Sequence, residues 1–313
     1  MLNNVRLKNN ILVGAISTYK VFYQFIITIM RLSYSTKLYY NYRLEDTIRR
    51  AAKIGYPGVE IWGGRPHAYY KDMDKASISS VKKVIEETGV EISGFIPAQF
   101  GYPTNLCSPI KNLREDSVEY IKKSIDTSLA LGCKKVSLCP GRTLYGQGYK
   151  QGMEDLNASL SDLVDYAIKK DVLLLLEPAH MLESDLILTI EDGVRIIEEQ
   201  KYENMGIALD TGHCHVNKES LVDTVYLLNQ KQIPMHIHLD DNNTMGDQHK
   251  ITGEGTIDFA PFLQALIVTG YDGYLTVELG FDYTANPDAA AYKSKKVVLL
   301  LIEEAKTNIR EKG

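Results

Sequence analysis

The chain has 313 residues, of which 44% are apolar and 24% are charged, and its formal net charge is −5. This composition excludes a disordered or collagen-like chain and predicts a soluble globular protein. Because no surplus of basic side chains is available to follow a phosphate backbone, we expect a small-molecule partner and no nucleic acid. The length allows either two ordinary domains or one α/β barrel of about 250 residues.

The four cysteines, at positions 107, 133, 139 and 214, form no Cys-x-x-Cys pair and no dense framework. This pattern indicates reduced thiols, and therefore a cytoplasmic protein. We expect the four side chains to act as small buried hydrophobic groups.

The start of the chain differs from the rest. Residues 11–30 are largely apolar, as in a signal or membrane segment, but Lys20 and Gln24 interrupt the run and no small-x-small cleavage site follows. We therefore expect residues 1–29 to be an N-terminal extension of unknown role and residues 30–313 to form the catalytic domain. A membrane anchor is the alternative for the extension, and no membrane partner is expected for the domain.

From residue 31 onward, short apolar runs recur that are typical of strands buried on both faces. Eight are expected, at residues 31–35, 58–62, 91–96, 135–138, 172–176, 206–209, 235–239 and 274–277. Between them, apolar residues at i, i+3 or i+4 and i+7 predict amphipathic helices. These stripes lie within residues 44–52, 118–129, 156–167 and 221–228.

Local signals mark several helix ends. Thr189 followed by Asp192 predicts a helix start. Glycines directly before the next strand predict helix stops, at Gly55, Gly89, Gly132 and Gly270. Eight βα units without a flexible linker predict a single (β/α)8 TIM barrel. A doubly wound open sheet is the alternative, although no Gly-x-Gly-x-x-Gly follows an early strand.

Ionisable side chains stand at the ends of the last four predicted strands: Glu177, Asp210, His238 and Glu278. Their separations of 33, 28 and 40 residues each match about one βα unit, so in a barrel they meet at its carboxyl-terminal mouth. Three carboxylates and one imidazole suit Mn²⁺, Mg²⁺ or Co²⁺, and Zn²⁺ is possible. Each residue alone could simply begin a solvated loop, but the regular recurrence favours a metal site. We expect His236 to point to the other face of the sheet as a core histidine.

Five short motifs carry a resemblance to a known family: Glu177-Pro178, Asp210-Thr211-Gly212-His213, His236-Ile237-His238, Gly253-Glu254-Gly255 and Val277-Glu278-Leu279. Together they resemble the sugar isomerase/epimerase group of xylose isomerase-like barrels, over residues 30–305. Within that group, residues 58–68 and 177–184 are most similar to the fructoselysine 3-epimerases, and D-tagatose and D-psicose 3-epimerases are similar at one remove.

The resemblance implies a divalent-metal-dependent 3-epimerase of a ketose or a ketosamine such as fructoselysine. Moving a hydrogen beside a ketone requires a base on one face, an acid on the other and stabilisation of the enediolate charge. By resemblance, Glu177 and Glu278 ligate the metal and exchange the proton at C3. Asp210 and His238 are then ligands only.

The resemblance also implies substrate contacts. His213 and Glu183 are expected to bind the sugar near C1 and C2, and Trp62 offers a flat apolar face to cover it. Glu60 and Arg65 are further candidates. His213 could instead be an ordinary loop histidine, and Trp62 a structural aromatic residue.

Several alternatives stay open. Another single-metal sugar or sugar phosphate isomerase, or a keto-inositol dehydratase, would share the ligand set, and a binding barrel without turnover is conceivable. A DNA-repair nuclease of the endonuclease IV type is similar at Asp210-x-x-His213, His238 and Asp247-Gln248-His249. Its three-zinc cluster needs further histidines after the third and fourth strands. The chain has 95–97 Phe-Ile-Pro and 139–140 Cys-Pro there, so two of the three metals are expected to lack ligands. A homo-oligomer is possible.

Overall fold

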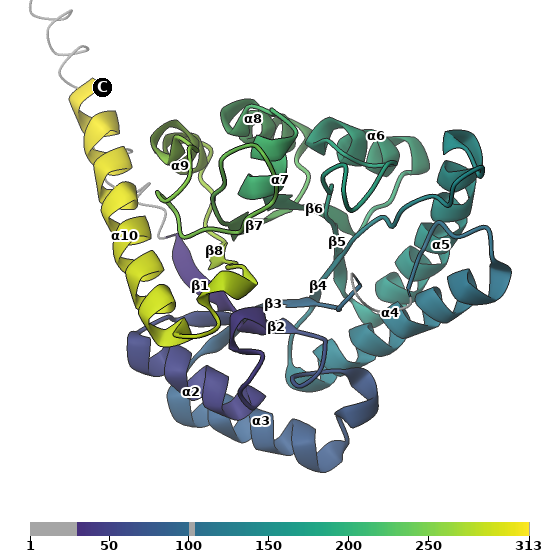
Figure 1. The fold of residues 1–313 in the computed structure, drawn as a ribbon, viewed down its shortest axis with the longest axis horizontal. Coiled ribbons are helices and arrows are strands. Elements are labelled where there is room, and N and C mark those ends of the chain that lie inside the picture. Colours follow the sequence, from purple (N-terminus) through teal and green to yellow (C-terminus); the bar gives the residue numbers. More distant parts are fainter. Residues whose placement is uncertain (1–29, 100–103, 313) are drawn as a thin grey trace, which may run out of the picture.

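The strands form a closed parallel barrel in which each strand pairs with the next and the last pairs with the first (Figure 1). The computed structural model describes residues 30–99 and 104–312, so the expected extension at residues 1–29 lies outside the described residues. Closure excludes the open sheet and confirms the single (β/α)8 barrel. The strands are β1 (Arg31–Ser35), β2 (Gly58–Trp62), β3 (Glu91–Ile96), β4 (Lys135–Leu138), β5 (Leu173–Leu176), β6 (Met205–Asp210), β7 (Met235–Leu239) and β8 (Tyr274–Val277).

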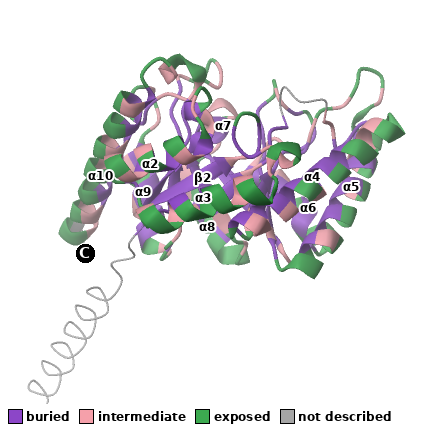
Figure 2. Cartoon of the chain, turned by 90° about the horizontal axis from the view of Figure 1, so that it is seen from below, coloured by how far each residue is buried: buried purple, intermediate pink, exposed green. Residues whose placement is uncertain are grey.

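Helices surround the strands and form the outer layer, with their exposed faces outward (Figure 2). Within the described ranges, no helix is both long enough and apolar enough to cross a membrane. The α-helices are α2 (Leu44–Ile54), α3 (Lys75–Thr88), α4 (Lys111–Leu131), α5 (Tyr149–Lys170), α6 (Ile190–Gln200), α7 (Thr211–Val216), α8 (Leu221–Lys231), α9 (Phe259–Val268) and α10 (Pro287–Lys312). Short 3-10 helices follow β1, precede α3 and follow β8: η1 (Thr36–Tyr39), η2 (Tyr70–Asp72) and η3 (Phe281–Tyr283).

The predicted helix ends are present. Thr189 caps α6 through a capping box: its hydroxyl accepts a hydrogen bond from the Asp192 amide, and the Asp192 carboxylate accepts one from the Thr189 amide. The predicted glycine stops all have positive φ, from 68° to 97°, a conformation that glycine adopts without steric cost: Gly55, Gly89, Gly132 and Gly270.

The barrel interior holds a layer of buried polar side chains. They come from β1, β2, β3, β7 and β8 and are hydrogen-bonded to one another: Ser33, Glu60, Ser93, His236, His238 and Thr276. Buried apolar residues of the strands and helices form the hydrophobic core of the protein. Because buried polar groups need partners, such a network fixes the orientation of its members.

Candidate metal and substrate site

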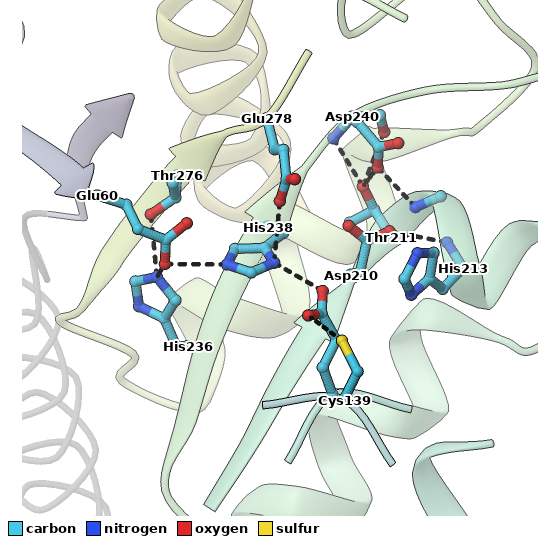
Figure 3. Close-up of polar contacts among 12 residues, drawn as sticks. Glu60, Cys139, Asp210, Thr211, His213, His236, His238, Asp240, Thr276 and Glu278 are labelled. Carbon is cyan, nitrogen blue, oxygen red and sulfur yellow. Dashed lines mark hydrogen bonds and ion pairs between the residues drawn. The ribbon is translucent and has the colours of Figure 1, made fainter. Parts of the chain in front are cut away.

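The structure brings together the four side chains expected to bind a metal. Glu177 follows β5, Asp210 ends β6, His238 lies on β7 opposite Asp210, and Glu278 follows β8. One ligand atom of each lies within 4.8 Å of those of the others, and none of the four residues is more than 3% exposed. All four therefore lie toward the carboxyl ends of their strands, and Figure 3 shows Asp210, His238 and Glu278 among them.

The electrostatics of this group favour a bound cation. His238 Nδ1 lies 2.9 Å from Glu177 Oε1 and 3.3 Å from Glu278 Oε2. Asp210 Oδ1 accepts a hydrogen bond from the His213 amide, but Oδ2 is buried and has no hydrogen-bond partner among the described residues. Burial, followed by the nearby charge of Asp240, raises the pKa of Asp210 well above its usual range. A divalent ion would satisfy the unpartnered oxygen and offset the repulsion, so the donor set fits a metal.

Lys37, on η1 after β1, is a site residue that the sequence did not reveal. Its Nζ donates a hydrogen bond of 2.9 Å to Glu278 Oε1. Burial disfavours the charged form of Lys37, but Glu278 raises its pKa above the usual value. Burial likewise opposes ionisation of Glu278, yet Lys37 and then His238 lower its pKa to about 2. Glu278 is therefore held as a carboxylate. A lysine directly after a strand is usually a solvated loop residue, so nothing in the sequence marked Lys37 as part of the site.

A cavity of about 430 Å³ reaches two of the four candidate ligands, Glu177 and Glu278. Three of the expected substrate contacts, Trp62, Glu183 and His213, line it together with Glu177 and Glu278. A larger cavity of about 690 Å³ lies between α2 and α10, but none of the candidate metal-binding groups lines it. We therefore place the functional site at the barrel mouth.

The other two expected substrate contacts lie elsewhere. Glu60 is fully buried inside the barrel, where its carboxylate contacts His236 and His238, and it is not part of the cavity wall. Arg65 pairs with Asp72 and stacks on a tyrosine ring, also away from the cavity wall. Strand position alone did not distinguish a side chain at the mouth from one deeper in the barrel.

The prediction that His236 points to the opposite face from His238 is wrong. Residues two apart on a strand share a face, so both imidazoles point into the barrel. Each places Nε2 3.1 Å from the same oxygen of Glu60 (Figure 3). The expectation of a core histidine holds, because His236 is 1% exposed and bonded to Glu60 and Thr276.

A second polar cluster borders the cavity, with one member on the loop after β5, one on α7 and two on the loop after β7. Imidazole Nε2 atoms of three histidines surround Asp247 Oδ2: His249 at 2.7 Å, His180 at 3.4 Å and His213 at 3.6 Å. His213 Nδ1 donates to the carbonyl of Pro178, which leaves Nε2 facing the cluster. His213, Asp247 and His249 also form a group that could hold an ion.

The Gly253-Glu254-Gly255 motif belongs to the loop after β7 that carries two members of this cluster, Asp247 and His249. The carboxylate of Asp241 accepts hydrogen bonds from the amides of Gly253 and Gly255, each at 2.9 Å. A Cβ at Gly255 would lie 2.2 Å from Asp241 Oδ1, so the close approach requires glycine. The motif is therefore structural, and it holds the segment that includes Asp247 and His249.

Comparison with known proteins places the chain in a family. The family model described as xylose isomerase-like TIM barrel matches residues 48–298. Fructoselysine 3-epimerase of Shigella flexneri is 29% identical over 269 residues, which cover 83% of this chain and 94% of the relative. The probable endonuclease 4 of Ureaplasma parvum is 26% identical over 236 residues, which cover 70% of this chain and 76% of the relative.

Among solved structures, a D-tagatose 3-epimerase-like protein superposes with a TM-score of 0.78 at 24% identity, covering 90% of this chain and 100% of that one. At this identity the likeness supports the fold. The match of the family model, which spans most of the barrel, agrees with the resemblance of the motifs. The chain belongs to the xylose isomerase-like TIM barrel family.

Proposed function

We propose that the protein is a divalent-metal-dependent 3-epimerase of a ketose or ketosamine, with a fructoselysine-like compound as the leading substrate. One observation carries the proposal: Glu177 and Glu278 both reach His238 Nδ1 at the floor of the cavity, within 4.8 Å of Asp210. Two carboxylates at one point provide the base and the acid that inversion at C3 requires. The Shigella flexneri relative supports this activity and substrate class.

Glu177, Asp210, His238 and Glu278 would hold the ion, with Mn²⁺, Co²⁺ or Mg²⁺ favoured by the oxygen-rich set and Zn²⁺ possible. When bound, the ion supplies positive charge beside the oxygens on C2 and C3, where an enediolate develops negative charge.

The protein's own side chains move the proton. One of Glu177 and Glu278, as a carboxylate, removes the proton from C3, and the other, in its protonated form, donates a proton to the opposite face of that carbon. The two groups exchange protonation states in each turnover. The two groups have different neighbours, because Lys37 contacts Glu278 and the Cys139 thiol lies 3.5 Å from Glu177 Oε2. Burial, and then the charge of Glu177, raises the pKa of Cys139 well above its usual range, so this thiol stays protonated beside the carboxylate.

Side chains around the cavity would orient the sugar. His213 Nε2 and Glu183 Oε2 lie 3.7 Å apart, and Glu183 Oε2 is buried with no hydrogen-bond partner among the described residues. We propose that they bind the oxygens on C1 and C2 and that Trp62 covers the apolar face of the sugar. The four cysteines are buried and unpaired, which supports the proposed cytoplasmic location.

Incubation with Mn²⁺ and a panel of ketoses and fructosamines in D₂O tests the proposal by NMR. We expect deuterium at C3 with inversion, and none with Glu177→Gln or Glu278→Gln. Label at C1 instead would indicate an aldose-ketose isomerase. Full exchange in either glutamine variant would contradict the two-carboxylate mechanism.

A nuclease is the second candidate, favoured by the His213, Asp247 and His249 group and by the endonuclease relative. Against it, Ile96 and Cys139 line the cavity where that cluster needs histidines, and the net charge is −5. Incision of DNA with an abasic site, tested with Zn²⁺, separates the two. We expect none.

A further inference from the structure

Glu60 is a buried carboxylate with two imidazole donors and no role in the cavity wall. It lies on β2 with none of its surface exposed. His236 Nε2 and His238 Nε2 each lie 3.1 Å from Glu60 Oε1. A carboxylate can only accept hydrogen bonds, so both Nε2 atoms must carry hydrogen and donate to it.

This contact decides which nitrogen of His238 faces the ligand group. A neutral imidazole that carries hydrogen on Nε2 has its lone pair on Nδ1. That nitrogen lies 2.9 Å from Glu177 Oε1 and 3.3 Å from Glu278 Oε2 (Figure 3). By the same rule, Nδ1 carries hydrogen and donates to Glu177 when no cation is bound. A cation shared with the two carboxylates would displace that hydrogen, and the Glu60 contact keeps the remaining one on Nε2.

The backbone is shaped to admit Glu60 at this point. The register of β2 and β3 shifts between Val59 and Glu60, which pair with Ile92 and Gly94, so one residue of β3 is bulged out. Bulges re-aim side chains near functional sites. A Cβ at Gly94 would lie 2.8 Å from Glu60 Oε1 and 3.3 Å from His236 Nε2. Glycine at this position therefore leaves the space that the carboxylate and the imidazole occupy.

We propose that Glu60 is a positioning residue: it holds His238 with hydrogen on Nε2, so that Nδ1 is the atom that binds the metal. The inference rests on the metal site of the proposed function. Partners of this kind orient a ligating histidine, and their loss commonly weakens metal binding about 10- to 100-fold.

Calorimetric titration of the full chain with Mn²⁺ tests the proposal. We expect about 10-fold weaker binding for Glu60→Gln, which keeps one acceptor, and up to about 100-fold for Glu60→Leu. Gly94→Ala should also weaken binding, since it displaces Glu60 while every polar group remains. Ser137→Ala is the matched control, because Ser137 is a buried polar residue on β4 with no hydrogen-bond partner among the described residues. Its affinity should stay within about twofold of wild type.

Tautomer analysis by ¹⁵N-histidine NMR of the Zn²⁺-loaded protein gives a readout that a merely structural role would not change. In wild type, His238 should show metal at Nδ1 and hydrogen at Nε2, and circular dichroism checks the folding of each variant. Metal at Nε2, or wild-type affinity in both Glu60 variants, would overturn this inference alone. Absence of any Mn²⁺ binding by the wild-type chain would overturn the proposed metal site as well.

Discussion

Replacing Lys37 by methionine should destabilise the metal-free protein and strengthen its binding of Mn²⁺. The Lys37 and Glu278 side chains are 27% and 4% exposed, and 2.9 Å separates their charged atoms. Breaking a buried ion pair costs about 3–5 kcal/mol, because the partner charge is left unpaired. Since a quarter of Lys37 is exposed, we take about 3 kcal/mol, the lower end of that range. With an unfolding entropy of about 2.1 cal/mol/K per residue, the melting temperature should fall by about 5 °C.

Added Mn²⁺ should reduce the difference in melting temperature between wild type and Lys37→Met, because the ion supplies the positive charge that Lys37 supplies in its absence. An ion at 100 times its Kd contributes about 2.7 kcal/mol to stability. Differential scanning fluorimetry with and without Mn²⁺ measures the difference in melting temperature in each condition. Lys134→Met, which removes an exposed pair with Asp171, is the control and should leave the melting temperature nearly unchanged. The reasoning would be refuted if the two melting temperatures differed equally with and without Mn²⁺, or if Lys37→Met melted at the wild-type temperature.

Three further predictions concern pH, a loop and metal removal. Burial raises the pKa of Glu219 from 4.5 to about 7, so the folded state favours the protonated carboxyl group. The free energy of unfolding should therefore fall by about 3 kcal/mol as the pH rises from 4.5 through 7. Urea unfolding should show this loss in wild type but not in Glu219→Gln, and parallel pH profiles would contradict it. Gly255→Ala drives a Cβ into Asp241 and should destabilise the protein by about 1–3 kcal/mol. Gly246→Ala is the control: a Cβ there meets open space, and stability should change by less than about 0.5 kcal/mol. Equal melting curves for the two variants would exclude the close approach at Gly255. Dialysis against a chelator should abolish exchange at C3 and Mn²⁺ should restore it, so full activity in the metal-free sample would contradict the ligand assignment.

The fold was predictable because its signals are local. Runs such as Leu173–Leu176 show buried strands directly, and most expected strand bounds agree with the structure. Some helix ends gave no such signal: Asp171, Lys201 and Gln232 end their helices with φ of 54–55°, where the sequence offers no glycine. The amide of each cap residue bonds to carbonyl groups in the last turn of its own helix, but residue type alone does not mark these positions.

The site was predictable only in part. The four candidate ligands recur once per βα unit at the strand ends, and that regular spacing placed them together. Contacts between side chains of distant strands leave no such pattern. Lys37 reaches Glu278 only because β1 closes on β8, and a bulge between β2 and β3 sets where Glu60 lies. The orientation expected for His236 is wrong because side chains alternate along a strand with a period of two residues, which puts His236 and His238 on the same face.

Anomalous diffraction from crystals soaked in Mn²⁺ tests the central claim most directly. We predict one strong peak within bonding distance of Glu177, Asp210, Glu278 and the Nδ1 atom of His238. A peak only at His213, Asp247 and His249, or no peak at the barrel mouth, would contradict the four-ligand metal site.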